Sequence, residues 1–247
     1  MTDQADERAP ASAMVVVAHP DDAEFLFAGT IAQWTRAGCE ATYVVITKGD
    51  KGSEDRSMTP SRLAEIREAE QRAAGEILGV KNYEFMGYPD GYLAHTLDLR
   101  RDLTALIRRY RPEVVMCFDP TTRFLMNTYP NHPDHRASGD ATVDAVFPCA
   151  RDHLTFPELL ADGLEPHKVA ELWMGASAEP NTWVDIGQTM EIKLKALMAH
   201  PSQLGEDVPD FARMMARESA AGQPMEFGES FRRIELDRPR EVFKDAT

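Results

Sequence analysis

The strongest constraint on the fold is the alternation of short apolar runs with longer amphipathic segments. Residues 14–18 and 113–118 are rich in aliphatic side chains and are predicted to form buried strands. Between such runs lie segments with helical spacing, such as residues 97–110, which end just before Pro112. Because strands that alternate with helices form βαβ units, we expect an α/β fold with a Rossmann-like, largely parallel sheet flanked by helices.

The same pattern predicts the individual elements. The predicted strands cover residues 14–18, 41–47, 82–86, 113–118, 171–174 and 183–186. The predicted helices cover residues 24–37, 60–78, 97–110, 137–147 and 190–199. Beyond Pro201 the pattern weakens and no element is assigned. We expect residues 1–12 to form a disordered tail and residues 13–247 a single domain.

Charge and cysteine usage narrow the class of protein. The formal net charge of the 247 residues is −14, whereas binding to nucleic acid or to an anionic membrane usually needs a basic face. No apolar run reaches the roughly 20 residues that span a bilayer, and no secretory signal pattern is present. Cys39, Cys117 and Cys149 have no paired spacing, which is typical of a reducing compartment. We therefore expect a cytoplasmic protein that binds neither nucleic acid nor membranes.

Two polar loops directly follow predicted strands. The first begins at His19-Pro20-Asp21-Asp22, and the second contains His132-Pro133-Asp134-His135. In parallel sheets, ligands bind beyond the carboxyl ends of the strands. If both strands lie near the centre of the sheet, the two loops face each other and their side chains form one site.

Three of these side chains have the character of metal ligands. Catalytic zinc sites use three protein ligands drawn from His, Asp and Glu, and they leave a further position for water. His19 and Asp22 lie three residues apart at a helix start, and His135 from the second loop completes the set. The sequence thus predicts a zinc site, although iron(II) or cobalt also suit such ligands.

The remaining side chains supply acid–base chemistry. Asp21 is placed to take a proton from a water that the metal activates. His132, if protonated, can stabilise an oxyanion and then protonate a departing amine, and Asp134 can hydrogen-bond the His132 ring and hold it charged. Helix capping is the alternative for Asp21 and, more strongly, for Asp134.

These motifs resemble those of the PIG-L/LmbE-type zinc N-deacetylases. The resemblance begins with AHPDDAEF at residues 18–25 and HPDH at residues 132–135. It continues through three further segments in the family's order: TKGDKG at 47–52, Arg67-x-x-Glu70 ahead of LGV at 78–80, and K-x-x-x-x-H-x-S-Q at 195–203. The likeness spans about residues 14–205.

The resemblance implies a role for each matched position. It implies metal ligands at His19, Asp22 and His135, a general base at Asp21 and a substrate-hydroxyl contact at Arg67. It also implies that His132, with Asp134 as its partner, polarises the carbonyl or protonates the amine. The alternative for Arg67 is an ordinary ion pair with Glu70, three residues later, on an exposed helix face. Two positions depart from the family pattern. Asp50 replaces a usual Glu, and Pro130 occupies a place where some sugar deacetylases have a tyrosine, with Tyr129 one residue out of register.

We therefore expect a metal-dependent hydrolase that removes an N-acyl group, most simply N-acetyl, from a small amino-sugar-type substrate. One alternative is an amidase that cleaves a larger sugar-linked amide, such as a thiol conjugate. Another is a non-catalytic metal-binding protein. A nucleotide-binding Rossmann module is excluded because the first loop has no glycine-rich sequence. The family likeness suggests a homo-oligomer, and the role of His200 stays open between structure and site.

Overall fold

The structure is a computed structural model that describes residues 8–125 and 129–237. The strands are β1 (Ser12–Val17), β2 (Glu40–Thr47), β3 (Asn82–Tyr88), β4 (Val114–Phe118), β5 (Phe124–Leu125), β6 (Tyr129–Pro130), β7 (Glu171–Gly175), β8 (Thr182–Asp185) and β9 (Gly228–Glu235). The helices are α1 (Asp22–Leu26), α2 (Ala28–Arg36), α3 (Pro60–Leu78), α4 (Leu97–Tyr110), α5 (Pro133–Val146), η1 (Cys149–Arg151), α6 (Pro157–Ala161), α7 (Met190–Leu197) and α8 (Val208–Ser219).

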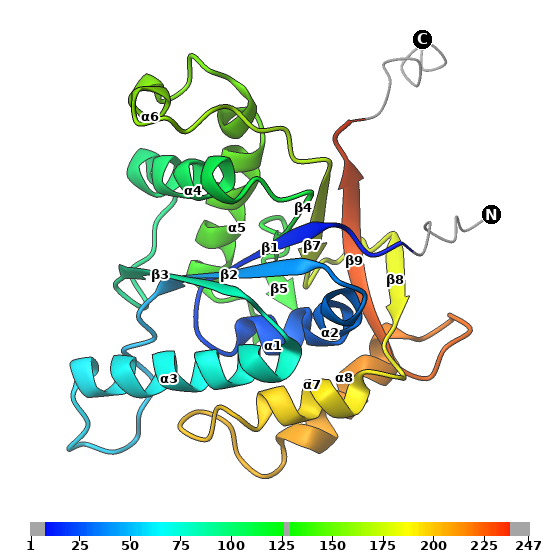
Figure 1. The fold of residues 1–247 in the computed structure, drawn as a ribbon. Coiled ribbons are helices and arrows are strands. Elements are labelled where there is room, and N and C mark those ends of the chain that lie inside the picture. Colours follow the sequence, from blue (N-terminus) through cyan, green and yellow to red (C-terminus); the bar gives the residue numbers. More distant parts are fainter. Residues whose placement is uncertain (1–7, 126–128, 238–247) are drawn as a thin grey trace.

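A mixed, mostly parallel sheet forms the centre of the molecule. Within the described residues it has seven strands in the order β3-β2-β1-β4-β7-β9-β8. Strands β3, β2, β1, β4 and β7 are parallel, and β9 is antiparallel to both β7 and β8. Helices α1, α2, α3, α7 and α8 cover one face, and α4, α5 and α6 cover the other (Figure 1). The predicted single-domain α/β fold is confirmed.

Strand β1 is buried on both faces, as its continuous apolar sequence predicts. Val15 and Val17 belong to the core beneath α2 and α3, whereas Met14 and Val16 belong to the core beneath α4 and α5. The two cores therefore meet at this strand. A central strand held from both sides gives a rigid base for the loop that leaves its carboxyl end.

The switch in strand order lies beside β1. From β1 the chain moves outward to β2 and β3, and it then returns to place β4 on the other side of β1. Loops that leave neighbouring strands in opposite directions open a crevice at their carboxyl ends. The loops after β1 and β4 are those that carry the two His/Asp motifs, so the sheet brings these motifs together.

The predicted helix over residues 24–37 is wrong in one respect, because the structure divides it into α1 and α2 at Phe27. Phe27 has φ −129° and ψ −10°, outside helical values, and its ring stacks on Phe231 at 5.9 Å. The break frees the backbone N–H groups of Gly29 and Thr30, and both donate to the Glu229 carboxylate at 2.8 Å. A buried acid at a helix start satisfies those donors and matches the helix dipole.

The other differences between prediction and structure concern the first residues of two elements and the region after Pro201. Helix α5 begins at Pro133 instead of residue 137, because His132 caps it. Helix α8 and strand β9 lie beyond Pro201, where no element was assigned. Residues 1–7 of the predicted tail lie outside the described residues, and β1 already begins at Ser12.

The described part of the chain bears on the expectations about membrane spans and disulfides. There, no helix has the length and apolar composition required for a bilayer span. Cys39, Cys117 and Cys149 are free, buried thiols.

The packing of α4 gives a stability prediction. Leu103 is 1% exposed in the core under α4, whereas Leu97 in the same helix is 67% exposed. Leu103→Ala removes buried methyl groups and leaves a cavity, so it is expected to lower the free energy of unfolding by about 2–5 kcal/mol. Leu97→Ala is the matched control and is expected to change it by less than about 0.5 kcal/mol. Urea unfolding measures both, and equal effects would contradict the assigned helix orientation.

Candidate functional site

The site lies at the carboxyl ends of β1 and β4. The loop after β1 places His19 and Asp21 directly before α1, whose first residue is Asp22. The segment after β4 passes through the β5–β6 hairpin and enters α5 with His132 as its cap. The His19 and His132 rings lie 4.8 Å apart between centroids. The expectation that the two loops face each other is therefore met.

His19, Asp22 and His135 come together as one group. Asp22 lies between the two histidines, with Oδ2 at 3.4 Å from Nδ1 of His19 and Oδ1 at 3.1 Å from Nε2 of His135. The backbone N–H of His19 also donates to Asp22 at 2.8 Å. Burial raises the pKa of the Asp22 carboxyl, but the charges and hydrogen bonds of His135 and His19 outweigh it and hold the pKa well below its usual range. Asp22 is thus an ionised carboxylate shared by two imidazoles.

The His135 ring is held in place by its surroundings. Its Nδ1 lies 3.1 Å from Oδ1 of Asn131, and the ring stacks on Phe118 with centroids 4.0 Å apart. Asn131 is itself buried and donates to the carbonyl of Thr122. A partner on one ring nitrogen fixes the orientation of an imidazole and leaves the other nitrogen for a metal. This arrangement fits a metal ligand.

The opposite edge of His19 meets two further carboxylates. Its Nε2 lies 3.1 Å from Oδ1 of Asp90 and 3.3 Å from Oδ2 of Asp134. Burial lowers the pKa of His19, but the hydrogen bonds to Asp134, Asp22 and Asp90 outweigh it and raise the pKa to about 12. The carboxylates around this ring therefore favour a positive charge here, which is what a divalent cation supplies. The donor set fits a metal.

Two alternative groups of possible ligands share His19 with the predicted set. One consists of His19, His132 and His135, and the other of His19, Asp90 and Asp134. Within each group the donor atoms lie within 4.8 Å of one another. The crevice thus contains enough nitrogen and oxygen donors for one metal ion together with carboxylates that orient its ligands.

The expected contact between the Asp134 carboxylate and the His132 ring differs from the structure. The backbone N–H of Asp134 donates to Nδ1 of His132 at 3.2 Å, and the Asp134 carboxylate turns away. It accepts hydrogen bonds from the N–H groups of Gly91 at 2.7 Å and Leu93 at 3.2 Å and contacts His19. Burial and the nearby positive His19 lower the pKa of His132. Because Nδ1 of His132 accepts a hydrogen bond, Nε2 is the ring nitrogen left to donate, and Asp134 orients His19 instead.

Asp21 faces the neighbouring Arg67. It is the capping residue of α1, yet its side chain makes no cap hydrogen bond, which argues against the simple capping alternative. Its Oδ2 instead accepts from a terminal nitrogen of Arg67 at 3.2 Å. Burial and repulsion from Asp22 raise the pKa of Asp21 to about 7, against the opposing charge of Arg67. A carboxylate that titrates near neutrality suits a general base.

Arg67 lies in the interior and not on an exposed helix face. It is 5% exposed, and its terminal nitrogens donate to the carbonyls of Pro20 at 2.8 Å and Gly49 at 3.1 Å as well as to Asp21. Gly49 has φ +58°, and a Cβ on it would lie 3.0 Å from the Arg67 guanidinium carbon, so this close approach needs glycine. The guanidinium therefore holds the base and its loop, and the substrate contact that the resemblance implies for Arg67 stays a prediction.

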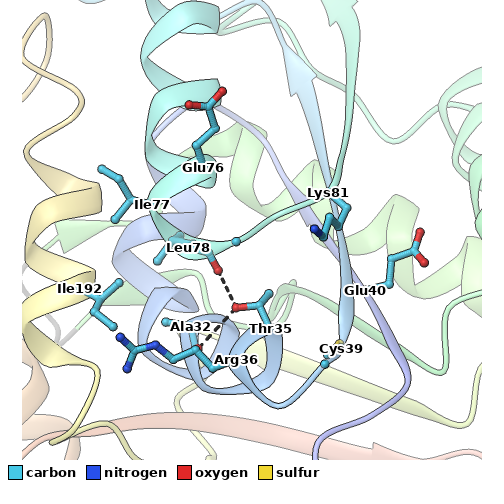
Figure 2. A pocket seen from close by; sticks show the side chains of 12 residues that line it. Ala32, Thr35, Arg36, Cys39, Glu40, Glu76, Ile77, Leu78, Lys81 and Ile192 are labelled. Atoms are coloured by element: carbon cyan, nitrogen blue, oxygen red, sulfur yellow. Dashed lines mark hydrogen bonds between the residues drawn. The ribbon is translucent and has the colours of Figure 1, made fainter.

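The pocket drawn in Figure 2 lies away from this crevice. It is formed by the C-terminal ends of α2 and α3 and by the start of β2, where Thr35 donates to the Leu78 carbonyl at 2.6 Å. Its lining residues include none of the predicted site residues. The functional assignment therefore rests on the cluster of His and Asp side chains at the carboxyl ends of the strands.

Comparison with known proteins agrees with this geometry. Residues 14–146, more than half of the chain, match the family described as "PIG-L: GlcNAc-PI de-N-acetylase". The chain belongs to the PIG-L family. The matched range includes both His/Asp loops and every predicted site residue.

Relatives extend the PIG-L match beyond those residues. Diacetylchitobiose deacetylase of Thermococcus kodakarensis is 35% identical over 190 residues, which cover 77% of this chain and 69% of that protein. The "Probable N-acetyl-alpha-D-glucosaminyl L-malate deacetylase 2" of Bacillus anthracis is 31% identical and covers 81% of this chain and 84% of that protein. The inhibitor-complexed N,N'-diacetylchitobiose deacetylase structure from Pyrococcus horikoshii is 30% identical, with a TM-score of 0.86 and coverage of 96% and 89%. The predicted family and the predicted class, a hydrolase acting on amide bonds, are confirmed.

Two residues that contact the predicted site residues were not predicted from the sequence. Asp90 is 6% exposed and contacts His19, and it follows the third parallel strand in Pro89-Asp90-Gly91, so an acid at a strand end was the available signal. Gln71 is completely buried and binds the backbone of Asp21, yet it lies mid-helix, directly after Arg67-x-x-Glu70 but outside the positions that this motif specifies. Tyr129 lies in β6 and is 62% exposed.

Proposed function

We propose that the protein is a zinc-dependent N-deacetylase that removes the acetyl group from a small amino-sugar substrate. The observation that carries the proposal is the convergence of Asp21 and His132 on the group formed by His19, Asp22 and His135. Such an arrangement brings together a metal-binding set, a base and a hydrogen-bond donor for an oxyanion. The named relatives act on diacetylchitobiose or on an N-acetylglucosaminyl conjugate, which supports an N-acetylglucosamine-type substrate.

Two exposed aromatic side chains on the loops that carry site residues favour a substrate with a flat or partly apolar face. Tyr92 is 77% exposed and lies between Gly91 and Leu93, whose N–H groups bind Asp134. Phe124 is 58% exposed in β5, on the hairpin that leads to His132. Exposed aromatic rings beside a polar site provide apolar contact area together with polar edges.

In this proposal His19, Asp22 and His135 hold the metal. A bound zinc ion supplies Lewis acidity and lowers the pKa of water toward about 7. Asp134, held by two backbone N–H groups, orients the ring of His19 from its other edge. Asp22 matches a ligand because it is ionised and already contacts both imidazoles.

The proton movements are assigned to the other two side chains. Asp21 accepts the proton of the attacking water, and Arg67 fixes the direction of its carboxylate. His132 donates a hydrogen bond from Nε2 to the developing oxyanion, since its Nδ1 already accepts the Asp134 N–H. Asp21 then passes the proton it has taken from water to the amine nitrogen, and cleavage of the C–N bond releases acetate and the free amino sugar.

An acetate-release assay tests the proposed activity. The zinc-loaded protein is incubated with N-acetylglucosamine, N,N'-diacetylchitobiose and, as the competing substrate class, a bulky N-acyl glucosamine conjugate. We expect acetate and free amine in equal amounts from at least one acetylated sugar. Turnover of the bulky amide with no acetate from either acetylated sugar would replace this proposal with the amidase alternative.

A further inference from the structure

A buried polar chain lies behind the proposed base. The backbone N–H of Asp21 donates to Oε1 of Gln71 at 3.0 Å, and Nε2 of Gln71 donates to Oε1 of Glu24 at 2.9 Å. The other Glu24 oxygen lies 3.3 Å from Nε2 of His200. Gln71, Glu24 and His200 are each 0% exposed. They come from α3, α1 and the turn after α7, so three separate segments converge behind one residue.

The chemistry of these groups fixes the direction of the Gln71 amide. A side-chain amide has a donor end and an acceptor end, whereas a carboxylate only accepts. With Glu24 at one end of Gln71, the amide nitrogen must face Glu24 and the amide oxygen must face Asp21. The reversed amide would place an oxygen against a carboxylate and an N–H group against the backbone N–H of Asp21. Glu24 therefore selects the orientation that accepts from Asp21.

The backbone of Asp21 needs such a restraint. Its φ of 91° lies in the left-handed region, which non-glycine residues rarely adopt without support from their surroundings. Arg67 binds the Asp21 carboxylate and the preceding carbonyl of Pro20. Gln71 binds the remaining group, the Asp21 N–H. Together they hold both the peptide and the carboxylate of this residue.

We propose that Gln71, oriented by Glu24 and His200, is a positioning residue that holds Asp21 in its left-handed conformation and so aims its carboxylate. The effect on turnover rests on the proposed function, whereas the effect on the Asp21 backbone does not. Burying the Glu24 carboxylate carries a desolvation penalty, so a gain in the stability of the fold does not readily explain why it is buried. A restraint on one strained, functional residue accounts for a buried Glu24 at this place.

Substitution of the amide by an apolar side chain of similar length tests the proposal. In metal-loaded Gln71→Met, we expect kcat to fall about 10- to 100-fold while KM and metal content stay roughly constant. The same change in an Asp21→Asn background is expected to have no further effect on kcat, because Gln71 acts only through Asp21. Gln33→Met is the matched control, since the Gln33 amide binds the Asp185 carbonyl outside this chain of contacts. We expect its kcat to be unchanged.

Hydrogen exchange of the Asp21 amide provides a readout that does not need turnover. The amide is expected to exchange slowly in the unaltered protein and faster in Gln71→Met and in Glu24→Gln, with Gln33→Met unchanged. If Gln71→Met does not fold, exchange in Glu24→Gln tests the proposal by itself. This variant retains the side-chain shape and removes only the carboxylate that accepts from Gln71. Unchanged exchange, or equal losses of kcat with and without Asp21, would overturn the proposal. Absence of acetate release by the unaltered protein would instead overturn the proposed function and leave the exchange result decisive for Gln71.

Discussion

Removal of bound metal by a chelator is expected to abolish acetate release, and added zinc is expected to restore it. The reason is that Asp21 and His132 alone must otherwise activate a water of ordinary pKa. A metal contributes several kcal/mol to the transition state, so the loss is expected to reach about 1,000-fold or more. Metal content and acetate release are measured on the same samples before and after dialysis.

Two variants identify which carboxylate binds the metal. Asp22→Asn keeps the side-chain shape but removes the charge between His19 and His135, so we expect metal content and activity to fall together. Asp90→Asn alters a carboxylate that contacts the other edge of His19 and lies 3.9 Å from Arg67, and we expect the metal to be retained. Metal loss in Asp90→Asn but not in Asp22→Asn would move the site to His19, Asp90 and Asp134. Full activity in metal-free protein would disprove the metal assignment altogether.

The sequence was sufficient for the part of the site that depends on neighbouring strands. His19 and Asp22 follow one apolar run, and His135 follows another, so their types and positions can be found by inspection. Their meeting required only that both strands be central in a parallel sheet, which the alternating pattern predicts. The order β2-β1-β4 satisfies that condition.

The contacts of individual polar atoms could not be predicted in the same way. Asp134 is near His132 in sequence, so a contact between their side chains was the simple expectation. The structure instead offers two N–H groups from Gly91 and Leu93, on a loop more than 40 residues earlier, and these bind the carboxylate more favourably. Arg67 likewise binds Pro20 and Gly49 from loops that no helical pattern reveals.

The break between α1 and α2 has the same cause. The apolar spacing of residues 24–37 fits one helix, but the structure places the buried Glu229 carboxylate where it can cap the start of a second one. That carboxylate accepts from Gly29 and Thr30 and pairs with Lys193 at 2.7 Å. It lies in β9, a strand whose charged sequence predicted no element. Local periodicity thus predicted a helix in this region, whereas the position of the break depends on an acid about 200 residues later.

Asp21→Asn is expected to lower kcat by about 10²- to 10⁴-fold while metal content is unchanged. The amide retains the shape and the Arg67 contact but cannot accept a proton as the carboxylate does. In a non-catalytic metal-binding protein, no measurable activity would depend on Asp21. Retained metal with unchanged acetate release in Asp21→Asn would therefore remove Asp21 from the mechanism.

The pH profile provides the corresponding test of how Asp21 is tuned. Burial and Asp22 raise the pKa of Asp21 to about 7, and the base is active only when ionised, so kcat/KM is expected to fall as the pH decreases through that pKa. A bound cation favours the ionised form, which places the acid limb at or below about pH 7. Arg67 lowers the same pKa, and Arg67→Met is therefore expected to move the acid limb to higher pH.

The acid limb that belongs to the Asp21 carboxyl should be absent in Asp21→Asn. An acid limb unmoved by both substitutions would mean that another group, such as a metal ligand, controls the profile.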